Sequence, residues 1–326
     1  MVDISIVGAG VVGLCVATEL LNRGLKVRVY DKAGKPGPHA CSWWAGGMLA
    51  PFCEAESAEE PVSRLGREAA SWWECLTPVY KRGSLVVAAP RDTADLKRFA
   101  RLTQNHRTLV GSDITELEPD LESRFVRALF FEDEAHINPR EALQSLYNLL
   151  HTSGADFVPS PPPDSLSNYI DCRGLAANDC MNDLRGVKGE MLIIRTKEIC
   201  FTRPIRLLHP RIPLYIVPRG DGVYMVGATT IESHDSERVS VRSMLELLSA
   251  AYALNPAFGE AEILETGVDL RPAFSDNLPK IRRLGNAIFA NGLYRHGYLL
   301  APVVAKQVAN LYLNNIAGEF VDEHHS

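Results

Sequence analysis

Residues 4–31, "ISIVGAGVVGLCVATELLNRGLKVRVYD", decide the fold of this 326-residue chain. Ile4–Val7 and Lys26–Asp31 are short apolar runs typical of buried strands, and the spacing of apolar residues over Val11–Arg23 predicts a helix. Gly24 suits the position just after a helix, where the backbone often turns left-handed. The chain is therefore expected to begin with a strand-helix-strand unit.

The glycines of this unit have the spacing of a dinucleotide-binding turn. Gly8, Gly10 and Gly13 follow the first strand and open the helix, while Asp31 ends the second strand. Glycine permits the tight turn and the close approach of a pyrophosphate, and the helix N-terminus donates N–H groups to it. An acid such as Asp31 accepts hydrogen bonds from a ribose and disfavours a 2′-phosphate, so the pattern predicts NAD or FAD rather than NADP.

The rest of the chain alternates between helical and β-rich patterns. The sequence predicts helices from near Asp92, from Asn138 to Gly154, over 240–254 and over Ala301–Ile316, and strands at Gly83–Ala89, 168–174 and Ala287–Ala290. Pro302 is expected in the first turn of the last helix. Residues 187–231 are β-rich, with a hairpin turn at Gly220 and Gly222. We therefore expect a nucleotide-binding domain that is interrupted by a second, sheet-based domain.

Composition and charge narrow the class of protein. The chain has 34 lysine and arginine residues against 40 aspartate and glutamate residues, a net charge of −6, so it lacks the basic surface of a nucleic-acid binder. No apolar run reaches the roughly 20 residues of a membrane span, and no leader precedes the first strand. The seven cysteines never occur as Cys-x-x-Cys, which indicates reduced thiols rather than disulfides or a zinc site. We expect a cytoplasmic protein that acts on small molecules.

Eight stretches in this order resemble the FAD-dependent amine and amino-acid oxidases of the D-amino-acid oxidase type, and within them the glycine oxidases of thiamine biosynthesis. They are "GAGVVG" with Asp31, "CSWWAGGMLAP", "HINPREAL", "DCRGLAA", "GEML", "LYIVPRGDGVYMVGATT", "GVDLRPAFSDNLPKI" and "FANGLYRHGYLLAP". The resemblance spans nearly the whole chain. It implies an α/β protein, with a Rossmann-type FAD-binding domain (1–76, 137–186 and 271–326) interrupted by an α+β substrate domain with an antiparallel sheet (77–136 and 187–270).

The resemblance also implies where non-covalent FAD binds. The stretch after the second strand would lie along the flavin, and the N-terminus of the last helix would meet the flavin edge where negative charge develops on reduction. No cysteine matches the covalent flavin linkage of the sarcosine-oxidase branch. The implied cofactor contacts are Gly8, Gly10, Val11, Val12, Gly13, Asp31, Lys32, Ser42, Gly46, Gly47, Met48, Leu49, Gly174, Arg295, His296, Gly297, Tyr298 and Leu299.

Four side chains are implied at the substrate. Arg271 would bind the substrate carboxylate, because a guanidinium fork holds a carboxylate bidentately and keeps its charge; the alternative is a structural ion pair with Asp269. Tyr215 would reach the same carboxylate, although a strand tyrosine is otherwise a core residue. Thr230 would form a pocket wall. Arg295 would be a second cation that faces either the carboxylate or the reduced flavin.

Other polar residues are expected to be structural. Arg219 is interpreted as a charge beside the hairpin turn, and Cys172 as a small buried side chain rather than a nucleophile. His136, His209 and His234 lack the spacing of a metal site or a catalytic triad. No metal ion is expected.

The implied reaction is the oxidative deamination of glycine and other small amino acids. The amine lone pair expels a hydride from Cα to flavin N5 without a protein acid or base, and O₂ reoxidises the flavin to give H₂O₂. The imine is expected to pass to a thiazole-forming enzyme. A homo-oligomer is compatible with the sequence. Two alternatives stay open: a D-amino-acid dehydrogenase that passes electrons to a quinone, and a non-catalytic flavin-binding subunit.

Overall fold

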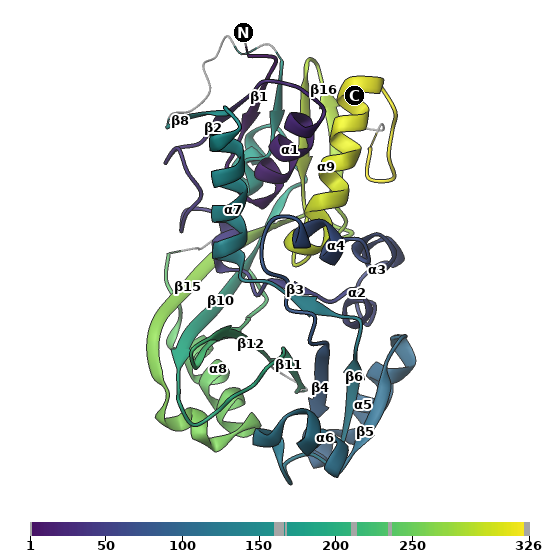
Figure 1. The fold of residues 1–326 in the computed structure, drawn as a ribbon, viewed down its shortest axis with the longest axis vertical. Coiled ribbons are helices and arrows are strands. Elements are labelled where there is room, and N and C mark those ends of the chain that lie inside the picture. The colour runs from purple at the N-terminus through teal and green to yellow at the C-terminus, as the bar shows by residue number, and fades with distance from the viewer. Residues whose placement is uncertain (1, 160–165, 167, 210–213, 234–236, 323–326) are drawn as a thin grey trace.

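The computed structural model describes residues 2–159, 166, 168–209, 214–233 and 237–322. Their strands form two large sheets, one above the other along the long axis of the molecule (Figure 1). Most of the proline cluster at 159–163 lies outside the described residues, as does His234. The structure therefore has no bearing on those parts of the sequence interpretation.

The first sheet contains six of the described strands, in the order β16-β17-β9-β1-β2-β8. All neighbours are parallel except β16, which is antiparallel to β17. The strands are β1 (Ile4–Val7), β2 (Val27–Tyr30), β8 (Asp156–Val158), β9 (Tyr169–Asp171), β16 (Lys280–Leu284) and β17 (Ala287–Asn291). Because three separate parts of the chain build it, the predicted interrupted Rossmann-type sheet is confirmed.

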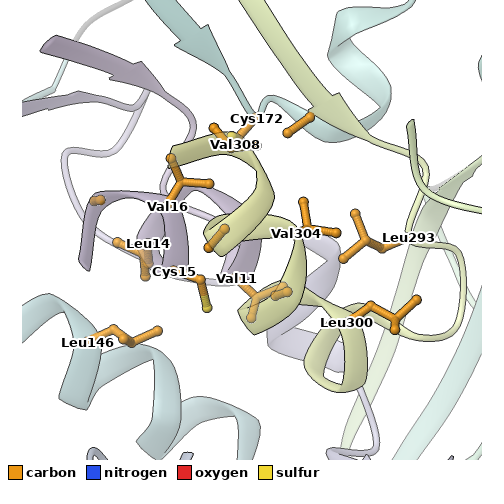
Figure 2. Packing of buried hydrophobic residues seen from close by; sticks show 14 of the residues in the cluster. Val11, Leu14, Cys15, Val16, Leu146, Cys172, Leu293, Leu300, Val304 and Val308 are labelled. Atoms are coloured by element: carbon orange, nitrogen blue, oxygen red, sulfur yellow. The ribbon is translucent and has the colours of Figure 1, made fainter. Parts of the chain in front are cut away.

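Three helices build the main core against this sheet. Helix α1 (Val11–Asn22) packs against α7 (Pro139–Thr152) and α9 (Gly297–Asn314). Figure 2 shows Leu14 of α1 and Val304 of α9 in this core, where both side chains are fully buried. Burying one such side chain contributes about 1.5–3 kcal/mol, so this packing anchors the first helix and the last to one another.

The second sheet contains nine of the described strands, in the order β14-β10-β13-β12-β11-β4-β6-β5, with β15 paired to β10. All neighbours are antiparallel except β11 and β4. The strands are β4 (Ser84–Ala88), β5 (Arg107–Val110), β6 (Arg127–Phe131), β10 (Arg185–Arg195), β11 (Ile205–Leu208), β12 (Leu214–Gly220), β13 (Val223–Gly227), β14 (Ile231–Glu232) and β15 (Glu262–Ala273). The expectation of a largely antiparallel second sheet is confirmed, while the domain boundaries in residue numbers stay a prediction.

Helices and a short ribbon complete the two halves. Helix α8 (Val241–Leu254) packs on β10, β12 and β13, α5 (Thr93–Leu102) packs on β4 and β6, and α6 (Ser112–Leu117) packs on β5. The sequence analysis predicted no helix at α2, α3 or α4, of which α3 and α4 pack on α9. Their bounds, with those of the ribbon strands β3 and β7, are Pro51–Glu54, Glu60–Gly66, Ala69–Glu74, Met48–Leu49 and Ala135–His136.

The predicted ends of two elements are confirmed by their hydrogen bonds and dihedral angles. Asn138 caps α7, because its side-chain oxygen accepts a hydrogen bond from the backbone N–H of Arg140. Gly220 and Gly222 both have positive φ, at 85° and 71°, in the turn between β12 and β13. Local sequence rules were therefore sufficient to predict the start of α7 and the turn between β12 and β13.

The last helix begins earlier than predicted. Helix α9 spans Gly297–Asn314 rather than Ala301–Ile316, so Pro302 lies inside the helix instead of at its start. Proline has no N–H to donate to the carbonyl four residues before it, which belongs to Tyr298. The indole Nε1 of Trp73 donates to that carbonyl at 2.8 Å. A tryptophan from α4 thus supplies the hydrogen bond that Pro302 removes.

All seven cysteines are free thiols. Burial raises the pKa of Cys15, Cys53 and Cys172 well above the ordinary value, so these thiols stay protonated. Cys172 fits its predicted role as a small buried side chain. No helix in the described part of the chain is both long enough and apolar enough to cross a bilayer.

Replacing Trp73 with phenylalanine should destabilise the fold through α9. The carbonyl of Tyr298 would lose its donor in a buried place, which costs about 1–3 kcal/mol. Equilibrium unfolding in urea should show a free energy of unfolding that is lower by this amount than in Trp72→Phe, a matched control at the partly exposed neighbour. Adding Pro302→Ala to Trp73→Phe returns a backbone donor and should restore part of the loss. Equal losses in the two tryptophan variants would contradict the assignment.

Candidate active site

A cavity of about 620 Å³ lies where the carboxyl ends of the parallel strands meet the second sheet. Val7, Tyr30 and Asn291 at the ends of β1, β2 and β17 line it from one side. Met191 and Arg271 of β10 and β15 line it from the other. Ligands of open α/β sheets bind at this edge, and the volume falls in the range of small-molecule sites.

The predicted cofactor residues gather around this cavity. All of them except Gly13 and Leu49 line it. Leu49 is 2% exposed and packs into the apolar core, so its prediction as a cavity contact is wrong. Gly13 lies behind the turn, where a Cβ atom would come within 1.9 Å of the carbonyl oxygen of Gly8. Its role is the close packing of helix against strand.

The first turn has the geometry of a pyrophosphate site. Gly8 has φ of +105°, and a Cβ atom there would lie 2.6 Å from the carbonyl oxygen of Cys172, so no other residue fits. The Val11 N–H donates to Ser42 Oγ at 3.3 Å. The N–H groups of Gly10 and Val12 have no partner among the described residues. Free donors at a helix N-terminus suit the pyrophosphate of a dinucleotide.

Asp31 already holds the turn together. Its carboxylate accepts hydrogen bonds from the N–H groups of Ala9 at 3.0 Å and Ala33 at 2.9 Å, and it lies 2.8 Å from His39 Nε2. An ionised carboxylate accepts about four hydrogen bonds, so these contacts leave room for a ribose hydroxyl. Sequence reasoning missed His39, because a histidine in a Gly- and Pro-rich stretch carries no periodic signal.

Residues 41–48, the 41–48 loop, form the wall between the two sheets. Gly47 has φ of +71°, and a Cβ atom there would lie 2.3 Å from the carbonyl oxygen of Ile137. A Cβ atom on Gly46 would lie 3.0 Å from the ring of Tyr215. Both glycines are buried and line the cavity, so a flat ligand can approach the backbone closely.

Arg219 does not lie at the hairpin surface, and the prediction of a turn-side charge is wrong. Its guanidinium donates to the carbonyl oxygens of Gly46 at 2.8 Å, Ile137 at 3.2 Å and Ala45 at 3.3 Å. Burial lowers the pKa of Arg219 to about 10. The side chain reaches the 41–48 loop, which the position of Arg219 near the end of a strand could not reveal.

Arg271 lies on β15 beside Gly189 of β10. Its Nη1 donates to the carbonyl oxygen of Thr229 at 3.0 Å, and a Cβ atom on Gly189 would lie 2.4 Å from its Cζ. In the part of the chain that the structure describes, Arg271 has no ion pair, and Asp269 accepts a hydrogen bond from the Leu270 N–H instead. The alternative of an Arg271–Asp269 pair is therefore not observed.

The two other predicted pocket residues differ in position. Tyr215 lines the cavity, and its hydroxyl has no hydrogen-bond partner within the described residues. Thr230 is exposed and does not line the cavity, because it follows the end of β13. Ala228 lines the cavity from that segment, and Thr229 turns its hydroxyl toward the buried carboxylate of Glu190 at 3.1 Å. The prediction for Thr230 is wrong.

Arg295 lines the cavity, but its charge faces a protein carboxylate. Its Nη2 lies 2.9 Å from Glu54 Oε2, and Arg206 of β11 donates to the other oxygen of Glu54. His296 Nδ1 lies 3.5 Å from Glu54 Oε2. Burial would raise the pKa of Glu54, but Arg206 and Arg295 outweigh it and hold the pKa well below the usual range. Glu54 replaces both anions that the sequence analysis considered for Arg295.

The start of α9 is held against the 41–48 loop. Tyr298 Oη lies 3.0 Å from the Ser42 carbonyl oxygen and 3.1 Å from that of Pro139. Gly174, with φ of +62°, accepts a hydrogen bond from Asn291 Nδ2 at 2.7 Å. These bonds fix the helix N-terminus beside the cavity, where unpaired N–H groups are available to a ligand.

His136 and the possible metal ligands are the last of the polar groups that the sequence analysis considered. His136 stacks on Tyr80 with ring centroids 5.0 Å apart, and burial lowers its pKa to about 3. Among the residues described here, no group of three or more histidine, cysteine, aspartate or glutamate side chains could hold a metal ion.

The chain is similar in sequence to oxidoreductases that are named for thiamine biosynthesis. The putative thiamine biosynthesis oxidoreductase ThiO of Rhizobium etli is 51% identical over 311 residues, or 94% of this chain and 95% of that protein. The bifunctional protein ThiO/ThiG of Trichormus variabilis is 25% identical over 99% of this chain, which spans about half, 54%, of that protein.

A glycine oxidase of Geobacillus kaustophilus is 25% identical over 95% of this chain and 92% of that protein. A crystal structure of glycine oxidase from that organism has a TM-score of 0.81 at 22% identity, with 98% and 96% of the two chains covered. The DAO family, described as FAD dependent oxidoreductase, matches residues 3–311. The chain therefore belongs to the DAO family of FAD-dependent oxidoreductases, as the resemblance in its motifs predicted.

Proposed function

We propose that this chain catalyses the FAD-dependent oxidative deamination of glycine and other small amino acids. Arg271 is the observation that carries the substrate assignment. Of the arginines that line the cavity, Arg173 pairs with Asp171 and Asp179, and Arg295 pairs with Glu54. Arg271 alone among them has no carboxylate partner in the described residues, so a ligand carboxylate is the anion that matches it.

The residues around Arg271 support the same assignment. Tyr215 has a free hydroxyl on the cavity wall and is the second donor that we assign to the carboxylate. Burial raises the pKa of Cys41 to about 12, so this cavity-lining thiol stays protonated and is not a nucleophile. We propose that the chain binds and orients the amino acid without an acid or base of its own.

We assign the parts of FAD to the parts of the cavity by chemistry. The turn at Gly8 and Gly10 would hold the pyrophosphate, Asp31 the ribose, and the 41–48 loop with the start of α9 the isoalloxazine ring. FAD supplies the hydride acceptor in this reaction. The unpaired N–H groups and the glycine-lined wall described above suit such a group.

We further propose the context of the reaction. O₂ would reoxidise the flavin, and the imine would pass to a thiazole-forming enzyme. The name of the Rhizobium etli relative and the bifunctional protein ThiO/ThiG of Trichormus variabilis support the link to thiamine biosynthesis. Seven free thiols are consistent with a cytoplasmic location. We keep residues 1–76, 137–186 and 271–326 as the FAD-binding domain and 77–136 and 187–270 as the substrate domain.

Anaerobic addition of glycine to the purified yellow protein should bleach the flavin absorbance. Sarcosine and D-alanine are expected to act in the same way, and admitting air should restore the colour with release of H₂O₂. Persistent colour with all three substrates would refute the proposed reaction. Bleaching without peroxide, but with electron transfer to a quinone, would identify a dehydrogenase instead.

The variant Arg271→Ala should raise the KM for glycine by roughly a hundredfold or more. Loss of a charge-assisted contact to a carboxylate costs about 2–5 kcal/mol, and each 1.4 kcal/mol is a factor of ten. Arg271→Lys keeps the charge but not the fork, so its KM should lie between the two. Steady-state assays of peroxide release measure the KM for glycine in both variants and in the wild type. A wild-type KM in Arg271→Ala would exclude this arginine as the carboxylate ligand.

The variant Gly189→Ala should impair glycine binding while Arg271 is still present. Its new Cβ would collide with the guanidinium, so we expect KM to rise by roughly tenfold or more while FAD stays bound. Gly186→Ala on the same strand is the control, because the atoms nearest to its Cβ would belong to the side chains of Leu175 and Leu270 rather than to Arg271. Equal KM values in the two variants would show that the position of Arg271 is not needed.

A further inference from the structure

Arg219 is a half-buried cation that binds backbone rather than a carboxylate. Its Nη2 donates to the carbonyl oxygens of Ala45 and Gly46, and its Nη1 donates to that of Ile137. Ile137 in turn donates its N–H to the Gly47 carbonyl oxygen at 2.9 Å. One side chain from β12 therefore holds three consecutive residues of the 41–48 loop, directly or through Ile137.

The charge of Arg219 is not neutralised nearby. No ion pair to Arg219 occurs within the described ranges. The titratable groups that influence it most are Tyr298, Arg140, Tyr215 and Glu141, and none of them forms a hydrogen bond with it. Arg140 pairs with Glu265 at 2.8 Å. A half-buried charge whose guanidinium meets only carbonyl oxygens still loses part of its hydration without gaining a counter-ion, which points to a function.

The contacts of Arg219 orient two peptide groups. In a trans peptide the N–H points opposite to the C=O. The carbonyls of Ala45 and Gly46 point to Arg219, so the N–H groups of Gly46 and Gly47 point away from it. Both glycines are buried and line the cavity, and neither N–H has a partner in the part of the chain described. Buried N–H donors without partners are rare, which indicates that a ligand accepts from them.

We infer that Arg219 is a positioning residue that aims the Gly46 and Gly47 N–H groups at the isoalloxazine ring and holds a positive charge behind them. The inference rests on the proposed placement of that ring against the 41–48 loop. A cation on the carbonyl side polarises each peptide and strengthens its N–H as a donor. Reduction adds negative charge to the flavin, and oriented donors backed by a cation favour the reduced form. Arg219 thereby raises the reduction potential of the bound flavin.

Chemical reductive titration of the FAD-loaded protein, without any amino acid, tests this inference. The midpoint potential of the flavin is compared in the wild type, Arg219→Met and Arg140→Met. Arg140 is the matched control, because it also packs on this loop, over the rings of Trp43 and Trp44, but touches none of its carbonyls. We expect a more negative potential in Arg219→Met and a potential near wild type in Arg140→Met. Equal potentials in Arg219→Met and the wild type, or equal shifts in both variants, would overturn the inference.

Two further variants keep the test decisive if Arg219→Met fails to hold FAD. Arg219→Lys retains the charge, whereas Arg219→Gln retains a donor for the carbonyls but has no charge. We expect the higher potential in Arg219→Lys, and equal potentials in these two variants would refute the role of the charge. In stopped-flow mixing with glycine, Arg219→Gln should reduce its flavin roughly ten- to a hundredfold more slowly than the wild type.

The titration also separates this inference from the proposed reaction. Because no amino acid is present, the potential reports on Arg219 even if glycine fails to bleach the wild type. That failure would refute the substrate assignment and leave the potential difference standing. Normal bleaching by glycine together with an unchanged potential in Arg219→Met would refute the inference alone.

Discussion

The buried carboxylate of Glu54 joins the two halves of the molecule. Arg206 reaches it from β11 of the second sheet, and Arg295 reaches it from the segment that leads from the first sheet into α9. A carboxylate this deeply buried must be paired, and removing one partner of such a cluster typically costs about 3–5 kcal/mol. This interaction therefore links the second sheet to the segment before α9, beside the cavity that Glu54 and Arg295 line.

The same cluster determines which cation is left for a ligand. Because Glu54 satisfies Arg206 and Arg295 together, Arg271 remains the cavity arginine without an anion in the described residues. His296 sits in the cluster as a neutral side chain, since burial lowers its pKa to about 4. Among the arginines that line the cavity, Arg271 on β15 is thus the one left without a carboxylate in the described residues.

Glycines at close approaches shape the remaining walls. Gly8 and Gly47 meet carbonyl oxygens at distances that exclude a Cβ atom, and Gly189 makes room for the guanidinium of Arg271. The positions of Gly8 and Gly47 could be expected from their motifs. The need for a glycine at position 189 could not be predicted from the sequence. Its neighbour Arg271 lies 82 residues later and comes close only because β10 pairs with β15.

The sequence by itself determined the strand-helix-strand unit, the dinucleotide turn and the interrupted sheet, because glycine spacing and apolar periodicity act within a few residues. Through the family resemblance it also predicted that Arg271 and Tyr215 belong to the substrate pocket, and both line the cavity. Only the tertiary structure decided the partners of Arg219, Arg295 and Trp73, as well as the start of α9. Those partners lie far away in the chain, 241 residues apart for Arg295 and Glu54, and hydrogen bonds between such distant groups leave no local pattern.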